Sequence, residues 1–135
     1  MIYILIMSFN FDWKLYFFIS FLCVTLILLY GSVRCTTAFH FKDPLLTKLG
    51  PFDLDGWSVS HGLFYILLGY LFPDHFILLM FMGILWELME EFVLNSILPK
   101  GGGCQRWWFG RISDIPMNAI GFMIGVALSK KKLKN

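Results

Sequence analysis

The sequence predicts an all-α protein, a polytopic membrane bundle of about four transmembrane helices that forms a single domain over residues 1–135. Composition is the first reason: 58% of the residues are hydrophobic, 15% are charged, and the mean hydropathy is +0.70. A soluble domain is usually about 45–50% apolar and about 25% charged. The spacing of the charges is the second reason, because they separate long apolar runs. A soluble enzyme, a disordered chain and a disulfide-rich secreted domain are therefore poor interpretations.

Four apolar segments are expected to cross the membrane, at residues 15–33, 57–73, 75–98 and 113–129. The first is free of charge and close to the roughly 20 residues that a spanning helix needs. The second lies between two aspartates, the third contains three glutamates, and the fourth ends at a lysine tail (Lys130, Lys131, Lys132, Lys134). The second and fourth segments are short, so a buried or re-entrant helix is the alternative for each.

The connections carry little evidence about compartment or partners. Four spans put both termini on one side, and the lysine tail favours the cytosol for that side, where anionic headgroups would attract it. The net charge of +2 gives no indication of a nucleic-acid partner. Cys35 and Cys104 fall in connections on the same side and could pair in an oxidising compartment.

Ionisable residues inside the apolar segments are the main functional signal, because such groups are costly in a bilayer. His61 lies near the start of the second segment, Glu87 and Glu90 lie toward the end of the third, and Asp114 and Asn118 open the fourth. Alternating helix directions bring these positions to the same leaflet. Glu87 and Glu90 share a helix face, as do Asp114 and Asn118. Carboxylate and amide oxygens suit a hard divalent cation, Ca²⁺ or Mg²⁺.

Each of these residues also has a structural interpretation. The glutamates could pair with Arg106 or Arg111, and His61 could be a hydrogen-bonded interfacial histidine. Asp114 could be a helix cap and Asn118 a link between helices. Gly121 and Gly125 form a small-xxx-small pair, which lets another helix approach closely and could support a homo-oligomer.

The order of these motifs resembles the catalytic core of the eukaryotic base-exchange phosphatidylserine synthases. The resemblance covers about residues 58–128 and rests on His61, the sequence WELME at 86–90, the pair Trp107-Trp108, and Asp114-Ile115 followed by Asn118 and Gly121. The spacing of Arg111, Asp114, Asn118 and Gly121 is also similar to the VanZ-like membrane family. Phe109 stands where the synthases have an acidic residue, and this chain is much shorter than they are.

The resemblance to the synthases implies calcium-dependent exchange of a phospholipid headgroup for free serine, and so places Ca²⁺ ahead of Mg²⁺ or Mn²⁺ as the cation. It implies that His61 acts as the general base, that Glu87, Glu90, Asp114 and Asn118 hold the cation, and that Trp108, Arg111 and Glu91 contact the substrate. The membrane phospholipid is then the partner. A VanZ-like protein that binds a lipid or an amphipathic drug without catalysis is the first alternative. A small structural membrane protein is the second.

Overall fold

The computed structural model describes residues 11–37, 45, 47–49, 54–94 and 110–132. Within these ranges the chain forms four α-helices and no strand: α2 (Trp13–Thr37), α3 (Gly56–Leu71), α4 (Phe76–Met89) and α6 (Asp114–Lys132). A π-helical turn, η2 (Glu90–Leu94), continues α4. The all-α class is confirmed for this part of the chain. Each helix corresponds to one of the four predicted segments, although α3 ends two residues before the predicted end at 73. The predicted end of the third segment, at residue 98, lies outside the described residues.

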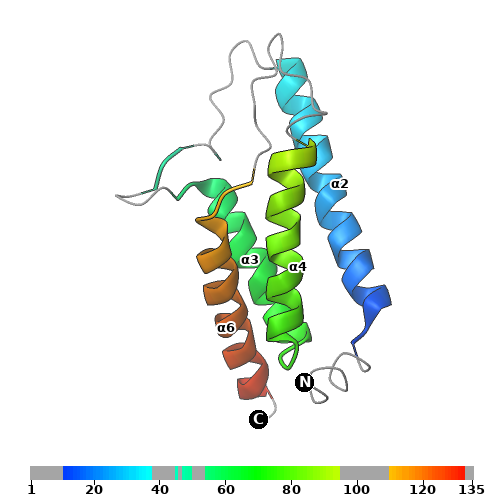
Figure 1. Cartoon of the computed structure of the whole chain (residues 1–135), viewed down its shortest axis with the longest axis vertical. Helices are drawn as coiled ribbons and strands as arrows, with labels where there is room; N and C mark the ends of the chain where they lie inside the picture. The colour runs from blue at the N-terminus through cyan, green and yellow to red at the C-terminus, as the bar shows by residue number, and fades with distance from the viewer. Residues whose placement is uncertain (1–10, 38–44, 46, 50–53, 95–109, 133–135) are drawn as a thin grey trace.

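The helices alternate in direction, as Figure 1 shows. α3 and α6 begin at the end of the bundle where α4 stops, and α2 begins at the opposite end. The turn between α3 and α4 is short: the N–H of His75 donates to the carbonyl oxygen of Phe72 at 3.1 Å, across Pro73-Asp74. This arrangement gives the predicted polar positions of three helices a common end.

α3 and α6 form the closely packed pair, because glycines line their contact. A Cβ on Gly121 would clash with the carbonyl oxygen of Gly62, and one on Gly125 would clash with that of Ile66. The small-xxx-small pair therefore serves a contact inside this chain. A homo-oligomer stays a prediction, and it would have to use another surface.

The apolar core lies toward the end where α3 stops and α4 begins. It is made of Phe11, Tyr65, Leu68, Phe72, Leu79 and Phe122, all at most 5% exposed. Aromatic rings continue the cluster onto the start of α2, with ring centroids of Phe11 and Phe72 4.7 Å apart. Toward the other end of α3, α4 and α6, the buried side chains become polar.

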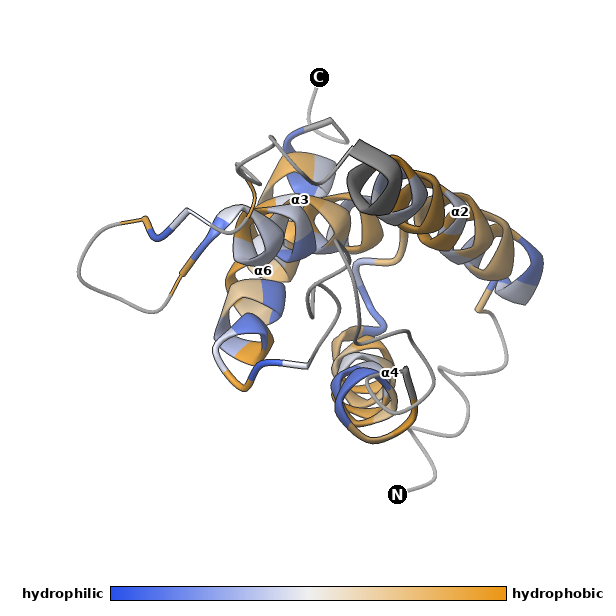
Figure 2. Ribbon diagram, turned by 90° about the horizontal axis from the view of Figure 1, so that it is seen from above, coloured by the Kyte–Doolittle hydropathy of each residue, from blue (hydrophilic) through white to orange (hydrophobic). Residues whose placement is uncertain are grey.

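α2 differs from the other helices in its surroundings. Over Trp13–Val33 it is the one described helix that is long and apolar enough to cross a membrane, and 6% of its most apolar stretch is buried. Viewed from above, α4 also stands apart from the α3–α6 pair (Figure 2). Residues of α2, α3 and α4 line the cavity described below.

Candidate functional site: a buried His-Glu-Glu cluster at the end of a cavity

Five of the predicted polar side chains lie together at the end of the bundle where α3 and α6 begin and α4 stops. Glu87, Glu90, Asp114 and Asn118 are each at most 6% exposed, and the His61 side chain is 19% exposed. The positions of these residues along alternating helices therefore predict correctly that their side chains lie near one another. Burial of three carboxyl groups in one place is costly unless a cation, a proton or a hydrogen-bond donor compensates each one.

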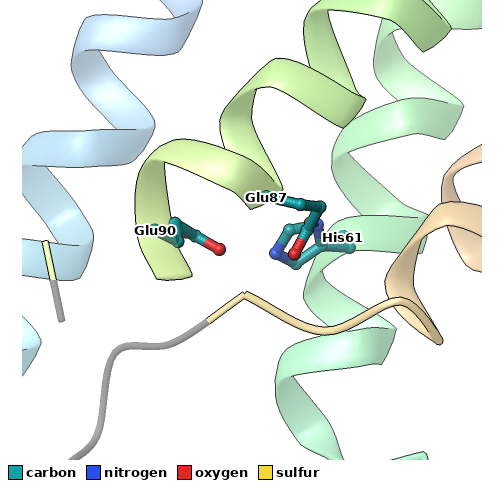
Figure 3. A group of neighbouring side chains, drawn as sticks. All are labelled: His61, Glu87 and Glu90. Atoms are coloured by element: carbon teal, nitrogen blue, oxygen red, sulfur yellow. The ribbon is translucent and has the colours of Figure 1, made fainter. Parts of the chain in front are cut away.

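His61, Glu87 and Glu90 form the cluster best arranged to hold a metal ion (Figure 3). One ligand atom from each side chain lies within 4.8 Å of the other two. His61 projects from α3, and the glutamates project from the last turns of α4 and the first position of η2. One imidazole nitrogen and two carboxylates are a common donor set for divalent cations. The structure thus brings His61 into the predicted ligand group.

The two carboxylate oxygens of Glu87 have different surroundings. Oε2 accepts a hydrogen bond from the backbone N–H of Arg111 at 2.8 Å. That approach depends on Gly110, where a Cβ would clash with the carbonyl oxygen of Glu87. Oε1 lies 3.4 Å from His61 Nδ1, beyond good hydrogen-bond distance, and is buried without a hydrogen-bond partner. An unsatisfied carboxylate oxygen that faces the cluster fits a cation.

A fourth buried carboxylate, Asp55, is not among the residues that the sequence indicates for the site. Its Oδ1 caps α3 by accepting the N–H groups of Trp57 at 3.0 Å and Ser58 at 3.1 Å. Its Oδ2 forms an ion pair with Arg111 Nη1 at 2.8 Å. In the sequence, Asp55 marks only the boundary of the apolar run. The available signal is an aspartate directly before an apolar helical segment, a preferred N-cap residue.

Asp114 and Asn118 occupy the α6 side of the site. Ser58 Oγ donates to Asp114 Oδ1 at 2.5 Å, which ties the start of α6 to the start of α3. Asp114 is the first residue of α6, and its side chain accepts a hydrogen bond from a residue of α3. Asn118 Oδ1 is buried with no hydrogen-bond partner, and its Nδ2 lies against Gly83. Both residues flank the His-Glu-Glu cluster.

The three predicted substrate contacts have different outcomes. Arg111 reaches the site, where its side chain is 22% exposed and neighbours a cavity. Glu91 is half-buried on η2 and does not line that cavity. Trp108 lies outside the described residues, as do Trp107, Arg106 and Cys104. Pairing of Cys35 with Cys104 therefore stays a prediction.

A cavity of about 500 Å³ leads away from the cluster between α2, α3 and α4. His61, Glu90, Arg111, Asp114 and Asn118 lie at its polar end, and apolar side chains form most of its remaining wall. Its size is that of a ligand-binding cavity.

Comparison with family models, curated proteins and solved structures finds no match to this chain. The interpretation of the site therefore rests on the residues of this chain.

Proposed function

We propose that this protein is a multi-pass integral membrane protein that binds a divalent cation and acts on phospholipid headgroups. The observation that carries the proposal is the buried His61–Glu87–Glu90 cluster at the polar end of an apolar cavity. Buried ionisable groups in such a setting are typical of functional sites.

The distribution of side chains supports more than one membrane crossing. Large apolar residues are exposed on every helix, for example Phe21 at 72%, Leu63 at 62% and Ile77 at 62%. Polar groups are buried between the helices instead, which is the reverse of a soluble bundle. α3 has 16 residues, about 24 Å at 1.5 Å per residue. A helix shorter than the hydrocarbon layer is accommodated by local thinning of the bilayer.

The cluster fits a cation in both donor type and charge. His61, Glu87 and Glu90 would hold it, and it would neutralise charge on a phosphodiester. The imidazole nitrogen favours Mn²⁺ or another first-row ion over Ca²⁺, which prefers oxygen ligands. Arg111 supplies a fixed positive charge at the same end of the cavity for the phosphate.

Headgroup exchange is the reaction that this arrangement and the resemblance to the synthases support. The phosphorus–oxygen bond to choline or ethanolamine breaks, one to the serine hydroxyl forms, and the hydroxyl proton leaves with the released alcohol. The synthase pattern makes His61 the general base for that proton. A cation bound at His61 Nδ1 would leave a hydrogen on Nε2, so the ligand and base roles exclude each other. We favour the ligand role because His61 Nδ1 faces the unsatisfied Oε1 of Glu87.

Proteoliposomes test the reaction directly. They would contain phosphatidylcholine and phosphatidylethanolamine, and labelled serine would be added with Mn²⁺, Ca²⁺ or a chelator. We expect cation-dependent label in lipid, its loss in His61→Ala, and its retention in His75→Ala, since His75 lies at the opposite end of the bundle. Folded protein that transfers no label under any cation would overturn the enzyme proposal.

The same variant separates the two roles of His61. If the imidazole is a ligand, His61→Ala loses both exchange and the Mn²⁺-induced rise in melting temperature. If it is a base, exchange is lost while the rise remains.

A further inference from the structure

One face of α2 is turned toward the cavity. Its lining residues are Tyr16, Ser20, Cys23, Val24 and Ile27, with Leu26 at the margin. Their spacing of three or four residues places the first five on one side of a helix. The neighbouring positions Phe21, Leu22 and Leu28 do not line the cavity and are 48–72% exposed. α2 therefore has two distinct faces, one toward the surroundings and one toward the largely apolar cavity.

The wall opposite α2 is also apolar and is built from α3 and α4. Phe64 and Tyr65 contribute from α3, and Met82, Trp86 and Met89 from α4. Gly83 lies between them, where a Cβ would clash with the hydroxyl group of Tyr65. The side chains around the cavity thus suit a flexible apolar ligand. The unbranched methionine side chains can change conformation to pack against such a ligand.

The two ends of the cavity differ in charge. Asp55, His61, Glu90, Arg111, Asp114 and Asn118 lie at one end, and the α2 lining toward Tyr16 runs away from them. A ligand that fills the whole space must therefore be amphipathic. Arg111 and a cation at the cluster would attract an anionic head, while the rest of the cavity would take a hydrocarbon chain.

Two leucines that line the cavity are also exposed at the surface of the bundle: Leu26 on α2 at 57% and Leu85 on α4 at 45%. An opening between these leucines would lead to the apolar surroundings of the bundle. A molecule already dissolved in the bilayer could enter there without crossing water.

We propose that this cavity binds one acyl chain of a glycerophospholipid taken from the surrounding bilayer, with its phosphate at Arg111 and the His61–Glu87–Glu90 cluster. The inference rests on the proposed function for the identity of the headgroup site. It adds the chain-binding half of the substrate and assigns α2 the role of its outer wall.

Crosslinking in proteoliposomes tests the proposal. A phosphatidylcholine with a diazirine in one acyl chain would be photolysed, and the adducts would be located by mass spectrometry. Annular lipid labels the exposed face of α2 in any case. A bound chain adds label at Cys23, Val24 and Ile27, and at Met82 on α4.

Two neighbouring variants provide a matched comparison. Ile27→Trp places a large ring in the cavity, whereas Leu28→Trp adds the same ring on the exposed face. We expect Ile27→Trp to reduce the adducts at Met82 roughly tenfold, equivalent to about 1.4 kcal/mol of binding free energy, and Leu28→Trp to leave them unchanged. Val24→Leu, a smaller filling substitution, should reduce them partly and serves if Ile27→Trp does not fold.

Adducts confined to the exposed face, or equal effects of the two tryptophan variants, would overturn the proposal. The Mn²⁺-induced rise in melting temperature is measured on the same samples. A rise without cavity labelling would refute the acyl-chain site and leave the cation site standing. Cavity labelling without a rise would refute the cation site and leave the acyl-chain site standing.

Discussion

Replacing Arg111 by Met is expected to destabilise the protein strongly, because it leaves the Asp55 carboxylate buried without its cation. Asp55 is 1% exposed, and its Oδ2 lies 2.8 Å from Arg111 Nη1. Removing one partner of a buried ion pair costs about 3–5 kcal/mol. The Arg111 side chain is 22% exposed, so water can reach this end of the pair and we expect a loss near the lower bound, about 3 kcal/mol. Methionine keeps the backbone N–H that binds Glu87.

A double-mutant cycle shows whether that loss belongs to the pair. Asp55→Asn retains a side-chain oxygen that can cap α3 and leaves a cation that water can reach, so we expect a cost of about 1 kcal/mol. The double variant should then resemble Asp55→Asn, with a coupling energy of about 3 kcal/mol. The assay is reversible unfolding in mixed micelles, followed by tryptophan fluorescence. Additive effects of the two substitutions would refute the reasoning, as would an Arg111→Met variant as stable as the original chain.

Three further outcomes follow from the described contacts. Saturating Mn²⁺, at about 100 times its dissociation constant, should stabilise the native state by about 2.7 kcal/mol. Thermal unfolding should show this stabilisation in the original chain and in Glu91→Gln but not in Glu87→Gln. A rise in melting temperature that survives Glu87→Gln would argue against the cluster. Gly125→Ala should cost about 1–3 kcal/mol, because its Cβ meets the backbone of α3; unchanged unfolding would mean that α3 and α6 are not packed so closely. Tyr65→Phe removes a donor to the carbonyl oxygen of Leu79 at 3.0 Å and should cost about 0.5–1.5 kcal/mol, measured by the same unfolding assay; a more stable variant would contradict that bond.

Much of the site could be predicted because alternating helices of similar length constrain depth. Once the apolar segments are placed, Glu87 near the end of one helix and Asp114 at the start of the next must lie at the same end. The i, i+3 spacing of Glu87 and Glu90 then places both on one face. These inferences need only helix periodicity and chain direction, which the sequence contains.

Pairing between side chains could not be predicted in the same way. Pairing of the glutamates with Arg106 or Arg111 was the structural alternative, but the Arg111 guanidinium pairs with Asp55, and its backbone N–H donates to Glu87. That choice depends on how the segment before α6 returns over the end of α4. Likewise, small residues at 121 and 125 predict a close helix contact but not whether α3 or a second copy provides it. The π-helical turn at Glu90 has no signal that composition or periodicity would detect.

The polar groups of the site all lie at one end of the helices, and this has a consequence for any bilayer-spanning form of the protein. Such a molecule can reach lipids of one leaflet only, so the product of the proposed headgroup exchange would accumulate asymmetrically. In vesicles reconstituted with random orientation, half of the molecules would face the lumen and could not use serine added outside. Sealed vesicles and vesicles opened by detergent would then differ about twofold in the number of working sites, and this difference would report the orientation of the protein.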